Sequence, residues 1–219
     1  MDTNYIYAVL QKLALIAPGF LLAITVHEFT HGYVAYKLGD PTAKLAGRLT
    51  FNPISHLDLF GTLVLVLTQM IGWAKPVPVD PRNLRNPRGD MLWISLGGPA
   101  ANLVTAVVLS ILLHLLVAVL GGPRGGDTSI FFLRPLYLIL AFGVQINVVL
   151  AVFNLIPVPP LDGSGIVAGL LPRAQAYEFE KLQPYGFIIL MILIFTGVIG
   201  YVIMPPINFI TGLLLFGLS

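Results

Sequence analysis

Two histidines and a glutamate stand close together in an apolar stretch of the sequence, ITVHEFTHGYVAY, residues 24–36. His27 and His31 are four residues apart, so on a helix both imidazole rings project from the same face, about one turn apart. This spacing lets two rings bind one zinc ion, with Glu28 beside them as a general base. Ionisable residues within an apolar span are rare and mark functional sites. The HEFTH motif therefore predicts a catalytic metal site.

A catalytic zinc ion usually has three protein ligands, so this site needs one more. The chain has no cysteine, which leaves His56, His114 and the carboxylates as candidates. At 1.5 Å per helical residue, His31 and His27 lie about 9 and 15 Å before Lys37, so the metal should lie shallowly below the membrane surface on that side. His114 is at the wrong depth for such a site, near the far end of its own apolar run, and His56 is also typical of a turn.

Asp162 lies at a suitable depth for the third ligand. It follows a stretch in which Pro157, Pro159 and Pro160 must break a helix. Non-helical backbone at membrane depth occurs only where it is buried in protein or lines a water-filled cavity. Asp162 can therefore bind the metal, but Asp-Gly is also turn chemistry and could form an ordinary turn at the membrane surface. The residues alone leave both interpretations open.

The composition is that of an integral membrane protein. Hydrophobic residues make up 57% of the 219 residues and charged residues only 10%, with a mean hydropathy of +0.88, whereas soluble domains are about 25% charged. The first apolar run is too long for a signal peptide and has no basic segment before it. Runs of spanning length, the last of them shorter, lie at about 5–36, 92–120, 134–157, 183–203 and 204–218. We expect an all-α polytopic membrane protein with about five transmembrane helices.

A further apolar run, residues 59–73, is too short to span and is interrupted by glycine and polar residues, which is typical of a re-entrant segment. If the chain returns there to the side it came from, nine of the twelve basic residues share one side: Lys37, Lys44, Arg48, Lys75, Arg82, Arg85, Arg88, Arg173 and Lys181. The positive-inside rule assigns that side to the cytoplasm. We therefore expect the active site towards the cytoplasm, the N-terminus outside, and a small β element, the strand 46–52, on the cytoplasmic side.

Five motifs resemble, in order, those of the site-2 protease family of intramembrane zinc metalloproteases: HEFTHG (27–32), NPISHLDLFGT (52–62), GWAKPVPV (72–79), GGPAAN (97–102) and NLIPVPPLDG (154–163). The resemblance covers most of residues 20–170 and is closest in kind to the short prokaryotic branch without a PDZ or other regulatory domain. It implies one membrane-embedded protease domain over 1–219, with a catalytic core at about 5–170 and C-terminal helices at about 183–218.

The resemblance also implies roles for individual residues. His27, His31 and Asp162 are expected to bind one Zn²⁺ per chain, and Glu28 is expected to be the catalytic base. The implied substrate is a membrane protein whose peptide chain is cut in or near a transmembrane helix, as in regulated intramembrane proteolysis. Asn154 is a candidate for a hydrogen bond to the substrate or the oxyanion, as for the family's corresponding asparagine. An ordinary contact between helices is the alternative for Asn154.

A helical substrate must unwind before its peptide bond can be attacked, and unwinding in lipid leaves backbone groups unpaired. Leu49 and Thr50, in the expected strand, are therefore candidates for substrate binding by strand addition. Asn102 and Asn147 are expected to form polar contacts between helices, and Gly98 to allow close helix packing.

Two other classes of function are alternatives to a protease: a metal-ion transporter and a catalytically inactive binding protein. A metal-ion transporter would be expected to show paired inverted repeats with matching broken helices, but the chain has a single HExxH and a single LDG. A catalytically inactive binding homologue would be expected to lack Glu28. We expect the partners to be the lipid bilayer and a membrane-protein substrate, with no nucleic acid, at a multi-pass location in the cell membrane. The oligomeric state stays open.

Overall fold

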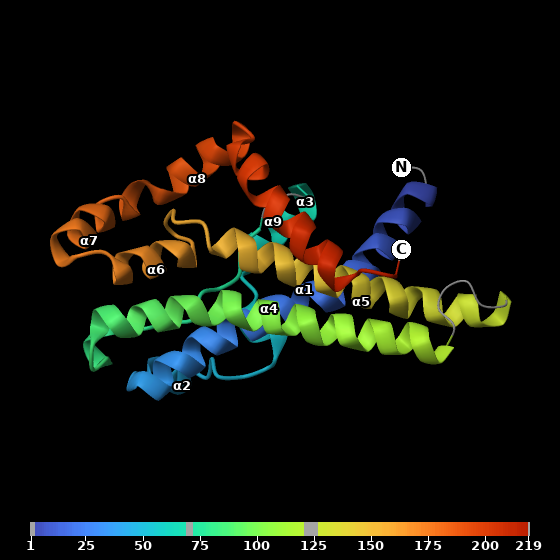
Figure 1. Cartoon of the computed structure of the whole chain (residues 1–219), viewed down its shortest axis with the longest axis horizontal. Coiled ribbons are helices and arrows are strands. Elements are labelled where there is room, and N and C mark those ends of the chain that lie inside the picture. Colours follow the sequence, from blue (N-terminus) through green and yellow to red (C-terminus); the bar gives the residue numbers. More distant parts are fainter. Residues whose placement is uncertain (1–2, 69–71, 121–126, 219) are drawn as a thin grey trace.

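The computed structural model describes residues 3–68, 72–120 and 127–218, and most of this part of the chain is helical. Three long helices form its body and contact one another pairwise (Figure 1): α1 (Thr3–Leu38), α4 (Pro87–Leu120) and α5 (Asp127–Asn154). Small residues allow the close approach of α1 and α5, because a Cβ at Gly19 would lie only 2.8 Å from Gly143 Cα.

The shorter helices precede α4 or follow α5 in the chain. Before α4 come α2 (Thr42–Leu45), the 3₁₀ turn η1 (Pro53–His56), α3 (Leu59–Thr68) and the 3₁₀ turn η2 (Pro81–Asn83). After α5 come α6 (Asp162–Leu170), α7 (Arg173–Glu180), the 3₁₀ turn η4 (Gln183–Tyr185), α8 (Gly186–Phe195) and α9 (Val198–Leu214). Helix α6 packs on α4, and α9 packs on α5. An apolar core lies where α4, α5 and α9 meet, around Ala106, Val144, Val148 and Ile207.

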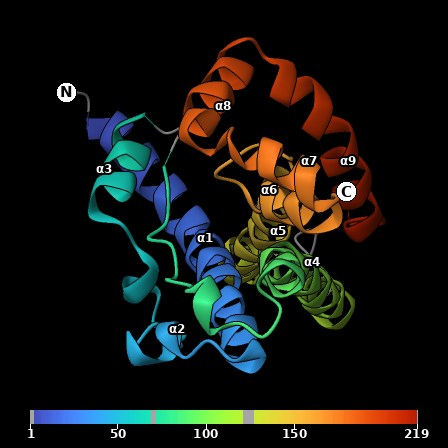
Figure 2. The ribbon, with the colours of Figure 1, turned by 90° about the vertical axis from the view of Figure 1, so that its left-hand side faces the viewer.

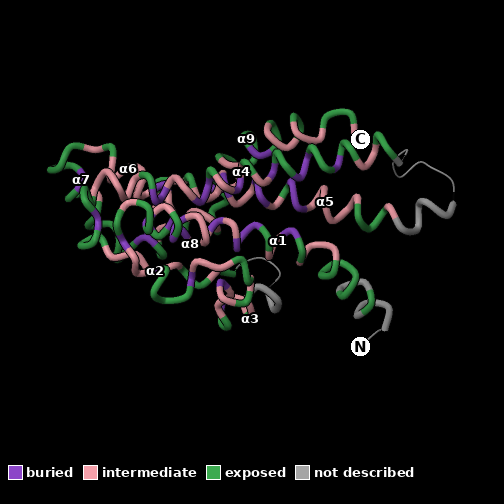
Figure 3. The backbone as a smooth tube through the Cα atoms, turned by 90° about the horizontal axis from the view of Figure 1, so that it is seen from below, coloured by how far each residue is buried: buried purple, intermediate pink, exposed green. Residues whose placement is uncertain are grey.

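The outer faces of the long helices carry large apolar side chains. Figure 3 shows buried residues alternating with exposed ones along these helices, and the exposed residues of α4 include Val104, Ile111 and Leu115. Extended apolar surfaces of this kind mark contact with a membrane or a partner. Within the described residues, three segments are long and apolar enough to cross a membrane: Leu10–Leu38, Pro87–Val119 and Leu133–Asn154.

The expected count of five spans is not confirmed. Residues 173–214 form a helical pair, Arg173–Phe195 and Val198–Leu214, bent by 77°, which brings the count to four if it is one span. The sequence divided this region into apolar runs at about 183–203 and 204–218, but this boundary lies inside α9, as do Pro205 and Pro206, and the bend is at Gly197. Gly197 adopts φ +77°, a left-handed conformation that costs a glycine little and typically ends a helix.

The strand expected at residues 46–52 is absent, so that prediction was wrong. After α2 the chain forms a helix-ending turn instead: Gly47, at φ +68°, donates its N–H to Lys44 O, and Arg48 donates its N–H to Ala43 O. These are the two hydrogen bonds of a Schellman motif, which uses the backbone groups that a strand would need. The single β contact within the described residues is an antiparallel bridge between Leu57 and Ala74.

That bridge bears on the segment expected to be re-entrant, residues 59–73. Figure 2 shows the chain leaving α2, rising to α3 and returning beside its outgoing path. The Leu57–Ala74 bridge and a hydrogen bond from Lys75 N to His56 O (2.9 Å) join the two ends of this excursion. Residues 69–71 lie outside the described part of the chain. The described ends lie side by side, which is the geometry that a re-entrant segment requires.

Candidate metal centre

The two motif histidines meet the distant aspartate in the interior of the bundle. His27 and His31 project from one face of α1, and their Nε2 atoms are 3.0 Å apart. Asp162 Oδ2 lies 3.1 Å from His27 Nε2 and 3.3 Å from His31 Nε2. Within the residues that the structure describes, this is the only group of three or more potential ligand side chains close enough to share a metal ion. The structure thus brings together the three ligands expected from the sequence.

Helix α4 fixes how the two rings are turned. His27 Nδ1 lies 2.6 Å from Asn102 Oδ1, and His31 Nδ1 lies 2.7 Å from the backbone carbonyl of Ile94. A carbonyl oxygen only accepts, so His31 Nδ1 is the donor in its hydrogen bond. In a neutral ring the Nε2 atom then carries a lone pair, and in both rings this atom faces Asp162.

Asp162 owes its place to the break after α5. It is the first residue of α6, and Leu161 before it is extended. Gly163 lies directly against the carbonyl groups of Leu155 and Ile156, where a Cβ would have no room. The Asp-Gly pair is therefore the tightly packed start of a helix and not a turn at the surface. Its Oδ2 atom is buried, and none of the residues that the structure describes forms a hydrogen bond with it.

The donor set fits a zinc ion. Zinc sites take imidazole nitrogen and carboxylate oxygen at about 2.0–2.2 Å, so neighbouring ligands of a tetrahedral ion are about 3.3 Å apart. The three distances between the ligand atoms, 3.0, 3.1 and 3.3 Å, are close to this value. Buried acceptor atoms that face one another repel unless a cation lies between them. Asp162 Oδ2, which is buried and has no hydrogen-bond partner among the described residues, is the clearest sign that a cation belongs at this site.

Glu28 follows His27 in α1 and is held by a hydrogen bond to the segment between α3 and α4. Its Oε2 accepts a hydrogen bond from Val77 N (2.9 Å), within the motif GWAKPVPV. The buried Arg48 side chain fixes the same segment by donating to Lys75 O (2.7 Å) and Pro76 O (3.3 Å). The segment between α3 and α4 is thus tied to the helix that carries the motif.

A buried carboxylate at the end of α1 fixes the far end of that segment. Asp40 is completely buried and accepts hydrogen bonds from Asp80 N (2.7 Å), from Asn83 Nδ2 (2.9 Å) and from the backbone and hydroxyl of Thr42. Burial alone would raise the pKa of the Asp40 carboxyl, but the hydrogen bonds outweigh burial and lower it below its usual value.

Two residues of α4 that the sequence assigned to plain helix packing lie against the two histidines of the candidate metal site. A Cβ at Gly98 would stand 2.5 Å from both His27 Cε1 and His31 Nε2. Asn102 does join helices, as expected, but it also contacts His27. With Ile94 these residues recur every four positions, so they share one face of α4. In the sequence, a glycine and an asparagine four residues apart, Gly98 and Asn102, were the available signal that this face of the helix lies against the two histidines.

The other candidates do not join the three ligands through any hydrogen bond of the described residues. Asn154 Nδ2 donates to Leu150 O within its own helix (2.9 Å). Thr50 O accepts from the buried His56, whose ring supports the turn after α2. The Leu49 side chain lies against Gly32, where a Cβ would stand 2.9 Å from it. The roles of Asn154, Leu49 and Thr50 in substrate binding stay predictions.

Comparison with known proteins gives related sequences over almost the whole chain. The model of peptidase family M50 matches residues 129–196, which include Asp162. The chain is 39% identical over 205 residues to "Putative zinc metalloprotease YwhC" of Bacillus subtilis (strain 168), covering 94% of this chain and 91% of that protein. It is 28% identical over 190 residues to "Putative zinc metalloprotease Rip2" of Mycolicibacterium smegmatis, covering 83% and 67%. No solved structure matches significantly.

Proposed function

Because this chain belongs to peptidase family M50, the site-2 protease family, we propose that it is an intramembrane zinc metalloprotease that hydrolyses peptide bonds in or near transmembrane segments of membrane-protein substrates. Its relatives are named as zinc metalloproteases, and its apolar helices are those of a membrane protein. The observation that carries the proposal is the convergence of three buried ligand atoms, from His27, His31 and Asp162, at the spacing of a zinc site.

We propose that these three residues hold one Zn²⁺ per chain. When bound, the ion would supply Lewis-acid chemistry, which activates a water molecule and polarises the scissile carbonyl. The residues of the chain orient it: α4 holds both rings through their Nδ1 atoms, and the start of α6 aims the carboxylate at them. The ligands come from two helices far apart in sequence, so the site exists only in the folded bundle.

Glu28 is the proposed general base. Its carboxylate takes a proton from the attacking water and passes it to the leaving amine. Val77 N–H holds Oε2, which leaves Oε1 as the oxygen that accepts the proton. One hydrogen of the Asn154 amide is used by Leu150 O, so the second can donate to the substrate or the oxyanion. Leu49 and Thr50 stay candidates for substrate contact, although the strand that suggested them is absent.

The proposal is tested with purified protein in liposomes and a model substrate that has one transmembrane helix. Wild-type protein should cleave it, a zinc chelator should abolish cleavage, and added zinc should restore it. Glu28→Gln should cleave about 10²–10⁴-fold more slowly, the usual contribution of a general base. Equal cleavage by wild type and Glu28→Gln would show that Glu28 is not the base and would overturn the proposal.

A further inference from the structure

We propose that Asn102 is a positioning residue of the metal centre, which holds the His27 ring in the one tautomer and orientation that present Nε2 to the metal. This inference rests on the proposed function, because it assigns a role towards the same ion. Asn102 lies in α4, is completely buried, and has no exposure to solvent through which water could satisfy its amide. All of its hydrogen bonds are therefore made within the protein.

The orientation of the Asn102 amide is fixed by two donations. Its Nδ2 atom donates to the backbone carbonyl of Ala23 (3.0 Å) in α1 and to Asn147 Oδ1 (2.9 Å) in α5. A backbone carbonyl only accepts, so the atom that faces Ala23 must be the nitrogen. Both amide hydrogens are used, and Oδ1 has to point the other way, towards His27.

Asn147 fixes the same direction from the far end of the network. It is also completely buried, and its Nδ2 donates to Gly143 O (2.8 Å), one turn earlier in α5. Since that carbonyl can only accept, Asn147 presents its oxygen to Asn102. Two backbone carbonyls, in α1 and α5, therefore set the direction of every hydrogen bond in the network.

The orientation of the Asn102 amide determines which nitrogen of His27 carries the hydrogen. Asn102 Oδ1 can only accept, so His27 Nδ1 carries the hydrogen of their 2.6 Å contact. The neutral ring then has its lone pair on Nε2, the atom 3.1 Å from Asp162 Oδ2. Partners of this kind fix the tautomer of metal-binding histidines and raise their basicity.

The two histidines differ in how they are held, which makes the inference testable. His31 donates to the backbone carbonyl of Ile94, which no substitution removes. His27 depends on a side chain, that of Asn102. A purely structural role, as a contact between helices, would instead rest on the bonds to Ala23 and Asn147. Variants that separate the His27 contact from the helix contacts decide between the two roles.

Three variants provide this separation. Asn102→Leu removes every hydrogen bond of the amide and keeps the same branched arrangement of side-chain heavy atoms. Asn102→Asp keeps an acceptor for His27 Nδ1 but loses both donations to the neighbouring helices. Asn147→Leu removes one helix contact and leaves His27, Asn102 and Ala23 in place. The zinc dissociation constant of each is measured by chelator competition, and folding is checked by size-exclusion chromatography and thermal unfolding.

A positioning role predicts that Asn102→Leu binds zinc about 10–100-fold more weakly than wild type, the usual effect of removing such a partner. Asn102→Asp should bind more tightly than Asn102→Leu, and Asn147→Leu should stay within about threefold of wild type. In metal-free protein labelled with ¹⁵N-histidine, His27 should be protonated at Nδ1, and in Asn102→Leu that preference should be lost.

Several outcomes would overturn the inference. They are wild-type zinc affinity in Asn102→Leu, equal losses in Asn102→Leu and Asn102→Asp, or an Asn147→Leu defect as large as that of Asn102→Leu. If Asn102→Leu does not fold, the Asn102→Asp affinity and the wild-type tautomer still decide. A different result identifies failure of the proposed function: wild-type protein that binds no zinc, or that binds it equally well after Asp162→Ala.

Discussion

At the scale of single residues, the two imidazole rings of the candidate site need a neighbour without a side chain. Gly98 lies beneath both rings, where a Cβ would come within 2.5 Å of each. We predict that Gly98→Ala pushes the rings apart and weakens zinc binding by about tenfold or more, the lower end of the usual effect of substitutions next to metal ligands. Chelator competition on purified protein measures this effect.

The neighbouring glycine provides the matched control for Gly98. A Cβ at Gly97 would meet the Thr30 side chain at 3.3 Å and the Val34 side chain at 3.4 Å, contacts that small shifts can relieve. Gly97→Ala should therefore bind zinc nearly as wild type does. Equal losses in both alanine variants would mean that helix spacing, and not contact with the rings, explains the effect.

The residues of the site differ in how far the sequence alone could identify them. The candidate ligands His27, His31 and Asp162, which the structure brings together, could be selected from the sequence because few side-chain types bind zinc and each of them is costly inside a membrane. Gly98 and Asn102 could not, because glycines and amides serve ordinary packing in many membrane helices. Which of them face the rings depends on how α1 crosses α4, which only the fold determines.

At the scale of elements, the extended segment before α4 holds the proposed base. Val77 N–H is the hydrogen-bond donor to Glu28 Oε2. We predict that Val77→Pro, which removes this donor, leaves zinc content unchanged and lowers kcat by roughly tenfold, a part of the 10²–10⁴-fold that a general base contributes. Val77→Ala keeps the N–H and should cleave nearly as fast as wild type. A zinc-loaded Val77→Pro enzyme with wild-type kcat would show that this hydrogen bond does not position Glu28.

Asp40 should make the attachment of that segment dependent on pH. Its hydrogen bonds hold the folded pKa below the unfolded value of about 3.9. Its contribution to stability is therefore fully present above that value and is lost as the pH falls through the folded pKa. We predict that Asp40→Ala lowers the free energy of unfolding by about 2–3 kcal/mol at pH 7, because it leaves buried donors unpaired.

The Tm difference between wild type and Asp40→Ala, measured at each pH, checks this prediction. It should be constant from pH 7 to about pH 5 and should shrink below about pH 4. The Glu178 carboxylate makes only an exposed ion pair with Lys181, so Glu178→Ala should change Tm little. A Tm difference for Asp40→Ala that stays the same down to pH 3 would contradict a stabilising Asp40 carboxylate.

The elements also show what periodicity and composition can and cannot predict. The long apolar runs predicted α1, α4 and α5 because length and hydropathy alone identify such helices. The strand at 46–52 was wrong because Gly47 and Arg48 complete a helix-ending turn through backbone bonds that residue types do not reveal. The boundary between the runs 183–203 and 204–218 was misplaced because the prolines that follow it, Pro205 and Pro206, are tolerated within α9. The helix break is at Gly197, which follows α8 in a left-handed backbone conformation.

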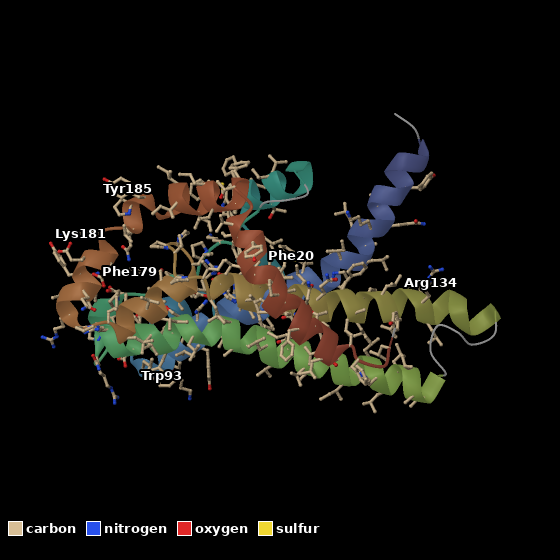
Figure 4. The ribbon with its side chains drawn as sticks, turned by 45° about the horizontal axis from the view of Figure 1, so that its top comes forward. Phe20, Trp93, Arg134, Phe179, Lys181 and Tyr185 are labelled. Atoms are coloured by element: carbon tan, nitrogen blue, oxygen red, sulfur yellow. The ribbon has the colours of Figure 1, made fainter. Side chains whose placement is uncertain are left out.

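At the scale of the whole molecule, the basic residues lie mainly at one end of the bundle. In Figure 1 the end of α1, α2, the start of α4 and α6–α7 gather at that end, and the start of α5 lies at the other. Figure 4 shows Lys181 and Arg134 at these opposite ends. This arrangement agrees with the topology expected from the sequence, in which the basic end faces the cytoplasm and the N-terminus lies outside.

Single cysteines test this topology, because the chain has none of its own. We predict that Lys44→Cys and Arg85→Cys react with a membrane-impermeant thiol reagent only from the cytoplasmic side, and Arg134→Cys only from outside. The expectation follows from the bridge between Leu57 and Ala74, which joins the two ends of the segment expected to be re-entrant. Labelling of positions 44 and 85 from opposite sides would mean that the chain between them crosses the membrane.

The most direct test of the central claim is the zinc content of three purified proteins, measured by elemental analysis beside cleavage of the transmembrane model substrate. Wild type should hold one zinc ion per chain and cleave. Glu28→Gln should hold one zinc ion and not cleave, since it loses the base but no ligand. Asp162→Ala should lose zinc and cleavage together, because it removes the carboxylate that completes the site. Full zinc occupancy in Asp162→Ala would contradict the assignment of His27, His31 and Asp162 as the metal ligands.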